Sequence, residues 1–594
     1  MLRPTPLIFL GALMLAACTG DIGGDEPKVD GPRTDPSGFS CDPEAAALTA
    51  SPIKRLAKSY VENAVLELLS PMDEASRTAL LGDIASRLEL IPEDVAPDPS
   101  NPYSTSDQNI SEEHVQMMFG LAVGLASKIA DTSLPYGDQL VSVCGAGSTR
   151  SALGDDACLT TFITSYGRRA FRRPLSQAEI DDFKAFYQQA AGAGVDPLSM
   201  LVGRFVGHPS FYYRFDSEGE VAEGTEGVDA VYALTKWELA SKITFLFWAG
   251  PPTDALLDRI ESTDITNDEE LASFVDAVLA DPKAERGMLR FYREWLDLED
   301  IAKRPGTEGN TVAGQAMLAA AGVESLPATY QEDMIQEVLD LTKHYTLSTE
   351  GTLDDILTSQ YSFAKTPELA TIYGVSTWDG SAENLVSLPS GERSGLLTRA
   401  AFVSSSAEYT RPIIKGEVIR TRVLCQPVAP PPPGLDIQPL THPADKSTRQ
   451  AVEEATADAQ CQACHGRLNG LGFTSENYDP TGRFRSTERR FAEDTADVVA
   501  ELSIDTRTTP ALSADDTTEV GNAVELSSYI AETGAADVCM VASYFEFVNG
   551  READPVTDGC DVLDMKDRLA AGESIKSVLR TSVLQESFRQ RLIK

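Results

Sequence analysis

The stretch Cys461-Gln-Ala-Cys464-His465 constrains this chain more than any other. Two thiols separated by two residues, with a histidine directly after them, are typical of covalent c-type haem attachment. The thiols add to the haem vinyl groups, and the adjacent imidazole becomes the proximal iron ligand. With 9 Cys and 5 His in 594 residues, chance produces such a pattern in about one chain in a thousand. The motif therefore predicts haem c, with Cys461 and Cys464 as attachment points and His465 as an iron ligand.

Three other interpretations of the motif remain open. A Cys-x-x-Cys pair can be a thioredoxin-like redox pair, although the surrounding pattern lacks the strand–helix setting of that site. It can be half of a zinc site, but no second Cys-x-x-Cys exists and the other histidines are scattered along the chain. It can also be a plain disulfide.

The start of the chain bears on haem attachment, because c-type haem is attached outside the cytoplasm. Residues 1–18 are expected to form a lipoprotein signal peptide, with Arg3 followed by an apolar core over 7–15 that is too short to span a bilayer. Small residues before Cys18 resemble a bacterial lipobox, which implies cleavage before Cys18 and lipidation of its thiol. An ordinary signal peptide with an incidental cysteine is the alternative. The residue after Cys18 is Thr19 and not an aspartate, and in bacterial lipoproteins this favours sorting to the outer membrane. We therefore expect the protein to face the periplasm or the cell surface.

No later stretch approaches 18 uninterrupted apolar residues, so we expect a membrane attachment by acyl chains and not by a helix. The net charge of −41 argues against nucleic acid as a partner, because phosphates would be repelled. The acidic surface suits a basic redox partner protein, and it is equally well explained by solubility.

Six cysteines remain when Cys18 is set aside for lipid and Cys461 and Cys464 for haem. An even number of remaining cysteines predicts disulfides in an oxidising compartment. The pairs that close short loops are Cys144–Cys158 and Cys539–Cys560, and elimination leaves Cys41 with Cys425. Six cysteines allow 15 connectivities, so the last pair is the least determined.

Apolar residues at spacings of three and four recur along most of the chain and predict a mainly α protein made of several small helical domains in series. Residues 19–50 are rich in Gly, Pro, Asp and Ser and are predicted to be a flexible tether. Pro427 and residues 430–433 predict a stiff polyproline segment. The helical domains are predicted at 51–135, 156–216, 230–375, 393–490 and 500–594, with the haem motif in the fourth.

Several motifs around the cysteines point to one family. They are Leu471-Gly472-Phe473, Glu476-Asn477-Tyr478-Asp479, Gly482-Arg483-Phe484-Arg485, the run 168–175 with 208–211, the run 239–248 with Trp295-Leu296, and Asn549-Gly550-Arg551. The stretch from 393 to 485 resembles the planctomycete-type cytochrome c domain family, which occurs in large exported proteins of planctomycetes and myxobacteria. The flanking stretches are similar to its companion domains of unknown function. Ala455 is a departure, because family members often have a histidine six residues before the first haem cysteine.

The resemblance implies a haem-bearing exported protein but carries no known reaction. We expect a monohaem protein with an electron-transfer or redox role; a surface scaffold with a vestigial motif and a haem enzyme with an open iron position are the alternatives. Met540 is the expected second axial ligand if a side chain fills that position, and core filler is its other interpretation. His442, in a polar linker, is expected to be solvated. The glycines after His465 are expected to allow close approach to a flat cofactor.

Overall fold

The computed structural model describes residues 33–42, 53–96, 102–216, 230–303, 312–320, 325–429, 440–492 and 497–592, together with isolated positions between them. The predictions for the signal peptide, for Cys18 and for the polyproline residues 430–433 lie outside these residues. The fold is mainly α, as predicted from the helical spacing. Among the described residues, no helix combines the length and the apolar composition needed to cross a bilayer.

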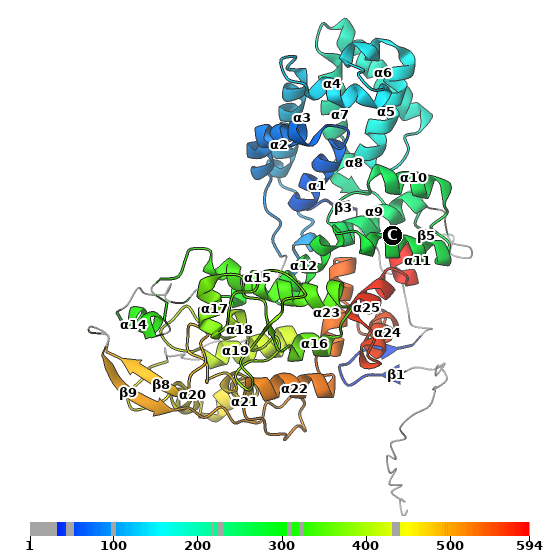
Figure 1. Cartoon of the computed structure of the whole chain (residues 1–594). Helices are drawn as coiled ribbons and strands as arrows, with labels where there is room; N and C mark the ends of the chain where they lie inside the picture. The colour runs from blue at the N-terminus through cyan, green and yellow to red at the C-terminus, as the bar shows by residue number, and fades with distance from the viewer. Residues whose placement is uncertain are drawn as a thin grey trace, which may run out of the picture.

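The first lobe is a bundle with its own apolar core, drawn in blue to cyan in Figure 1. Most of its helices begin at a side-chain cap; for example, the Glu179 carboxylate accepts the Ser176 backbone N–H at 2.8 Å in the capping box of α6. The bundle consists of α1 (Lys58–Leu68), α2 (Glu74–Glu89), α3 (Glu112–Ala130), α4 (Tyr136–Val141), α5 (Asp156–Phe171), α6 (Gln177–Gly192), α7 (Pro197–Val206) and α8 (Pro209–Tyr212), with the short turns η1 (Ser104–Ser106), η2 (Ser142–Cys144) and η3 (Arg150–Gly154).

The second lobe is larger, and one continuous core runs through it from residue 234 to residue 588. The three helical domains predicted after residue 230 therefore share a single core. Its first half consists of α9 (Lys236–Trp248), α10 (Asp254–Ser262), α11 (Asp268–Ala280), α12 (Ala284–Trp295), α13 (Leu298–Ile301), α14 (Val312–Ala320), α15 (Tyr330–Lys343), η4 (His344–Ser348), α16 (Leu353–Thr358), α17 (Pro367–Tyr373) and α18 (Ala400–Val403).

The second half of this lobe contains the haem motif, which lies on α21. Figure 1 places α19, α20 and α21 at the end of the lobe that is farthest from the first lobe. The elements are α19 (Pro412–Val418), the π-helical turn η5 (Ile419–Val423), α20 (Thr448–Ala455), α21 (Ala459–Phe473), α22 (Ala523–Thr533), α23 (Asp537–Asn549), α24 (Gly559–Ala570), α25 (Ile575–Ser582) and α26 (Glu586–Arg589).

The strands are short and pair only in antiparallel twos among the described residues. Two of the pairs join segments that are far apart in sequence, which ties the ends of the chain to the body. The pairs are β1 (Arg33–Thr34) with β2 (Ser40–Cys41), β3 (Lys54–Arg55) with β4 (Tyr213–Arg214), β5 (Val231–Ala233) with β10 (Gln590–Leu592), β6 (Tyr361–Ser362) with β7 (Val386–Ser387), and β8 (Thr487–Phe491) with β9 (Val498–Ser503).

Helix α9 joins the two lobes. It is buried from Leu239 to Trp248 apart from Lys242, and its Phe245 belongs to the core of the first lobe. The arginines that follow Tyr166 on α5 have a structural role, because Arg169 forms an ion pair of 2.6 Å with Asp254 on α10. This contact also crosses between the lobes.

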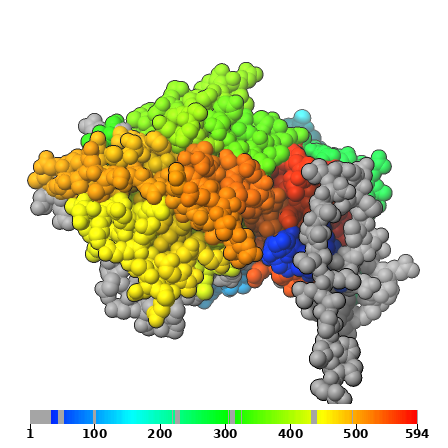
Figure 2. All heavy atoms as spheres, turned by 90° about the horizontal axis from the view of Figure 1, so that it is seen from below, coloured from blue at the N-terminus to red at the C-terminus, as the bar shows by residue number. Residues whose placement is uncertain are grey.

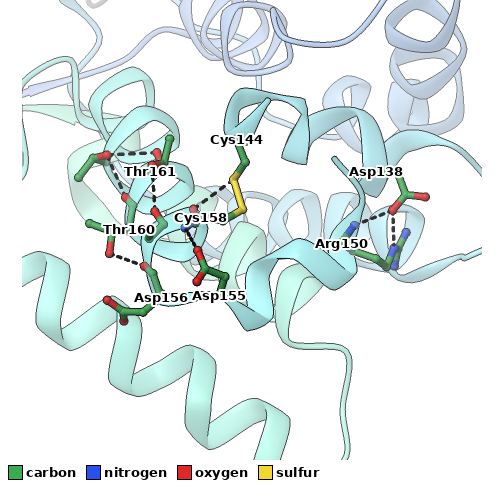
Figure 3. Close-up of a disulfide and its surroundings, with 10 residues drawn as sticks. Asp138, Cys144, Arg150, Asp155, Asp156, Cys158, Thr160 and Thr161 are labelled. Atoms are coloured by element: carbon green, nitrogen blue, oxygen red, sulfur yellow. Dashed lines mark hydrogen bonds and ion pairs between the residues drawn. A yellow bond between two sulfur atoms is a disulfide. The ribbon is translucent and has the colours of Figure 1, made fainter. Parts of the chain in front are cut away.

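The disulfide between Cys144 and Cys158 is confirmed. Cys144 ends η2, and Cys158 lies in the first turn of α5, where Asp155 caps the helix by accepting the Cys158 backbone N–H at 3.1 Å (Figure 3). The bridge closes a short loop, which is the case in which sequence proximity is a sound guide to the pairing.

The other two predicted pairings are wrong. Cys41 is bonded to Cys560, and Cys425 is bonded to Cys539. Short-loop reasoning fails because tertiary packing brings distant segments together: β2 packs against α24, and the segment after η5 reaches α23. All six cysteines predicted to form disulfides do form them.

The prediction of a flexible tether over residues 19–50 is wrong for residues 33–42. These residues form the β1–β2 hairpin, which lies against the C-terminal helices in Figure 2 and is fastened there by the Cys41–Cys560 bond. Ion pairs from Arg33 to Asp567 and from Asp35 to Lys566 add to this contact. The body of the protein therefore begins earlier than the composition suggests.

Peptide mapping of the oxidised protein without reduction is expected to find Cys41 joined to Cys560 and Cys425 joined to Cys539. Replacing Cys41 and Cys560 together by serine is expected to lower the free energy of unfolding by about 2–4 kcal/mol, because the bond restrains a very long loop. The control is the Cys144→Ser, Cys158→Ser variant, in which a much shorter loop is released. A peptide that joins Cys539 to Cys560 would contradict the fold described above.

Candidate functional site

The three residues of the haem motif lie on one side of α21, near its beginning. Cys464 follows Cys461 by three positions and His465 follows it by four, so the three side chains are neighbours on the helix surface. All three are half-buried, whereas the positions between and after them are exposed. The helix therefore presents two thiols and one imidazole together at the protein surface.

Both thiols of the motif are free. Every other cysteine among the described residues is in a disulfide. The plain-disulfide interpretation thus finds no support in the geometry of the motif. Within the same part of the chain, no three His, Cys, Asp or Glu side chains come together as a set of metal ligands.

The His465 ring carries a polar atom without a partner. Its Nδ1 is buried and makes no hydrogen bond within the protein. Leaving a buried polar atom unpaired costs about 1–3 kcal/mol, and such atoms in native structures usually have a partner. An iron-ligating imidazole uses one nitrogen for the metal and the other for a hydrogen bond. Free thiols beside an incompletely satisfied imidazole fit a haem-attachment site.

The face of α21 that carries the motif continues into the face that packs on α19. Cys461, His465, Leu468 and Gly472 follow one another at spacings of four, three and four, which places them on one side of the helix. Helices α19 and α21 make the most extensive helix–helix contact in the described part of the chain. The motif thus lies at the half-buried N-terminal end of this face of α21, whereas Leu468 and Gly472, farther along the same face, are packed against α19.

Glycine makes this helix contact possible. A Cβ atom on Gly472 would lie 1.8 Å from the Pro412 carbonyl oxygen, and one on Gly416 would lie 2.0 Å from the Leu468 carbonyl oxygen. A Cβ atom on Gly470 would lie 2.5 Å from the carbonyl oxygen of Thr509. The expectation that the glycines after His465 serve a flat cofactor is therefore wrong for Gly470 and Gly472, which admit protein backbone instead.

Arg420 holds the opposite end of the same contact. Its guanidinium is almost fully buried and donates to the Arg467 carbonyl on α21 at 2.6 Å. It also donates to the carbonyls of Pro510 and Ala511, each at 3.0 Å. One side chain thus joins η5, α21 and the segment after β9, which fixes the backbone two residues after His465.

The glutamate of the Glu-Asn-Tyr-Asp motif contacts the segment just before α19. Glu476 is buried, and its carboxylate accepts the Thr410 hydroxyl at 2.7 Å. Burial raises the pKa of Glu476, and Lys415 on α19 opposes that shift. Burial also lowers the pKa of Lys415 to about 8. Each group moves the pKa of the other toward its charged form, although no ion pair joins them and the Lys415 Nζ has no hydrogen-bond partner.

Asp479, in the same motif, shapes the loop that follows. Its carboxylate accepts the backbone N–H groups of Thr481 at 2.9 Å and of Arg483 at 3.1 Å. Tyr478 is fully buried, with its hydroxyl donating to the Glu392 carbonyl. The motif residues carried by the family resemblance thus build the support of α21.

A cavity of about 280 Å³ lies beside α19 and α20. His442 is part of its wall and stacks on Tyr409, with 3.9 Å between the ring centroids and 14° between the ring planes. Its Nδ1 is buried without a hydrogen-bond partner. Burial, together with the nearby charge of Arg490, lowers the pKa of His442 to about 4. The expectation of a solvated His442 is therefore wrong, because the ring stacks on Tyr409 and the residue is only partly exposed.

A second cavity, of about 390 Å³, also has Tyr409 in its wall. Its wall carries both arginine and acidic side chains, so it is a polar space. Its charged lining residues are Glu392, Glu408, Asp479, Arg483, Arg485, Glu488, Arg489 and Arg490.

Met540 lies away from the surface. It is fully buried in the main core on α23, which packs most against α24 and α12. The neighbouring Cys539 is bonded to Cys425, just after η5. The structure therefore places Met540 as a core side chain, and its role as an iron ligand stays a prediction.

Comparison with known protein families identifies three stretches of the chain. Residues 393–488 match PSCyt3, residues 234–375 match PSD4, and residues 158–216 match PSD5, which are described as proteins of unknown function (DUF1588, DUF1592 and DUF1595). The chain carries the PSCyt3, PSD4 and PSD5 domains. The resemblance predicted from the motifs is thereby confirmed, and the site on α21 lies inside the PSCyt3 domain. No curated protein and no solved structure matches the chain.

The packing of the PSCyt3 domain yields a matched pair of variants on α21. Gly472→Ala is expected to lower the free energy of unfolding by about 1–3 kcal/mol, because the new methyl group overlaps backbone that cannot yield. Gly466→Ala is expected to leave stability unchanged or to raise it by up to about 1 kcal/mol, because a Cβ atom at this exposed helical position would make only an ordinary contact, 3.5 Å from the Gln462 Oε1 atom. Chemical denaturation measures both. Equal effects of the two variants would refute the proposed role of Gly472.

Proposed function

We propose that this chain is an exported c-type cytochrome-like protein with one haem per chain and an electron-transfer or redox role. The observation that carries the proposal is the arrangement on α21, where two free thiols lie beside an imidazole with an unpartnered nitrogen. The match of residues 393–488 to PSCyt3, whose name points to a cytochrome c relation, supports it.

In this proposal Cys461 and Cys464 hold the haem and His465 is the proximal ligand. Haem c supplies a one-electron couple when it is bound. The chain's own residues fix the geometry: Gly416 and Gly472 set the spacing of α19 and α21, and Arg420 holds the backbone near His465. Rigid placement of the ligand suits electron transfer, in which little reorganisation is wanted.

We also propose that the protein is lipid-anchored at Cys18 to the outer membrane. Residues 19–32 separate Cys18 from the β1–β2 hairpin, and a chain of that length spans at most roughly 50 Å. The hairpin is bonded to α24, so the anchor would hold the second lobe, which contains the PSCyt3 domain, toward the membrane. A basic redox partner protein would suit the strongly acidic chain.

The exported protein, produced in cells with working haem-attachment machinery, is expected to contain one covalent haem. A pyridine haemochrome spectrum and a haem stain of the denatured protein measure it. Cys461→Ser and Cys464→Ser should each lose one thioether bond, with a large fall in haem content and a shifted haemochrome band. Gly466→Ala is the control and should keep the haem. A wild-type protein without a Soret band would leave the alternative of a surface scaffold with a vestigial motif.

The anchor has a separate test. Growth with a labelled fatty acid is expected to label the wild-type protein and not Cys18→Ala, because the acyl chains are attached through this cysteine. Membrane fractionation of the two proteins should differ in the same way. Equal labelling of both proteins would contradict lipidation at Cys18.

A further inference from the structure

We propose that the cavity of about 390 Å³ in the PSCyt3 domain is a binding site for a small organic acid that carries several hydroxyl groups, such as a sugar acid. Arg485 and Arg490 would hold its carboxylate. The proposal goes beyond the proposed function and does not depend on haem attachment, because no residue of α21 is part of the wall of this cavity.

The cavity is formed by segments that meet only in the tertiary structure. Its wall comes from the C-terminal half of α14, from residues 408–410 before α19, and from residues 479–491, which end with β8. Helix α14 and strand β8 lie at the same end of the second lobe (Figure 1), and the Arg483 guanidinium donates to the Ala320 carbonyl at the end of α14. Ser486 and Arg489 in the wall are exposed, so a ligand can enter from solvent. The volume is within the range of sites for small organic molecules.

Arginine is concentrated in this wall, although the chain as a whole is strongly acidic. Residues 483–490 include Arg483, Arg485, Arg489 and Arg490, and all four line the cavity. The full chain, by contrast, has 91 acidic residues and only 50 lysines and arginines. A guanidinium group can bind a carboxylate through two parallel N–H bonds, which makes arginine the usual residue for this recognition.

Two of these arginines have a buried donor without a hydrogen-bond partner in the described part of the chain. Arg485 donates from Nε to the Glu476 carbonyl at 3.1 Å, but its Nη2 has no hydrogen bond and lies 3.9 Å from the Glu476 carboxylate. The Arg490 side chain is 3% exposed; it donates to the Lys446 carbonyl and pairs with Glu488, but its Nε has no partner. Buried donors normally have an acceptor, so the wall lacks one.

The two buried carboxylates of the wall are already engaged by the protein. Asp479 accepts the backbone N–H groups described above, and its oxygens also accept the Thr481 hydroxyl. Glu488 accepts the Thr448 backbone N–H at 3.0 Å and the Thr448 hydroxyl at 2.6 Å, in addition to its ion pair with Arg490. The unused hydrogen-bonding capacity of this part of the wall is therefore that of donors, which favours an anionic ligand over a cationic one.

The rest of the wall suits hydroxyl groups on the ligand. Carboxylates accept hydrogen bonds from hydroxyl groups, and serine and threonine hydroxyls both donate and accept them. The Tyr409 ring adds a flat surface, and its position is fixed by the Arg490 guanidinium at 4.8 Å and by the stacked His442 ring. A hydroxylated acid thus matches both parts of the wall. The polar lining residues outside the arginines and the two engaged carboxylates are Glu392, Glu408, Thr410, Ser486 and Thr487.

The test is a calorimetric titration of the full-length protein with three probes: glucuronate, glucose, which lacks the carboxylate, and cyclohexanecarboxylate, which lacks the hydroxyl groups. Glucuronate is expected to bind once per chain, at least about tenfold more tightly than either other probe. Arg485→Gln is expected to weaken glucuronate binding about tenfold or more. The control is Arg507→Gln, outside the cavity wall with a side chain that is 69% exposed, and it should bind glucuronate as the wild type does.

The wild-type comparison of the three probes stands even if Arg485→Gln fails to fold, which circular dichroism would show. Absence of glucuronate binding, equal binding of glucose, or unchanged binding by a folded Arg485→Gln protein would overturn the proposal. Inorganic phosphate that binds as tightly as glucuronate would overturn it too, because the site would then recognise a bare anion. Cys461→Ser should bind glucuronate as the wild type does, so failure of the haem proposal and failure of this one are observed separately.

Discussion

The contact of α19 with α21 is the constraint on which the rest of the site depends. Two helices approach until backbone meets backbone, because Gly416 and Gly472 put no side chain between them. Close packing of this kind leaves little freedom of rotation or sliding, since any shift drives main-chain atoms together. The motif lies on the same face of α21, two turns before Gly472. Its orientation is therefore set by a contact that it does not itself make.

Buried titratable groups lie beside this contact. Lys415 and Glu476 are each buried, and burial shifts their pKa values toward the neutral forms. The attraction between the two groups opposes both shifts, but no ion pair joins them, and the Lys415 Nζ and Glu476 Oε1 atoms are buried without a hydrogen-bond partner. The position of α19 therefore depends on the close backbone packing against α21 and not on this pair.

The sequence predicts the helical class and the short-loop bridge Cys144–Cys158, because each depends on neighbours along the chain. It fails where the partner is distant. Cys41 meets Cys560 because a hairpin packs on α24, and no local pattern records that packing. Gly472 shows the same limit. A glycine after a haem-attachment motif can allow close approach either of another backbone segment or of a cofactor, and only the tertiary structure distinguishes the two.

The division of the described cysteines into six that form disulfides and two that are free links the fold to the proposed chemistry. In the exported location proposed here, thiols meet an oxidising environment. Six cysteines form bonds whose partners are held together by packed elements. Cys461 and Cys464 lie one turn apart on a surface-facing part of α21, where thiols are open to exchange and oxidation. Thioether bonds to haem would remove both from that chemistry permanently, so the pair gains stability from the same reaction that would give the protein its redox centre.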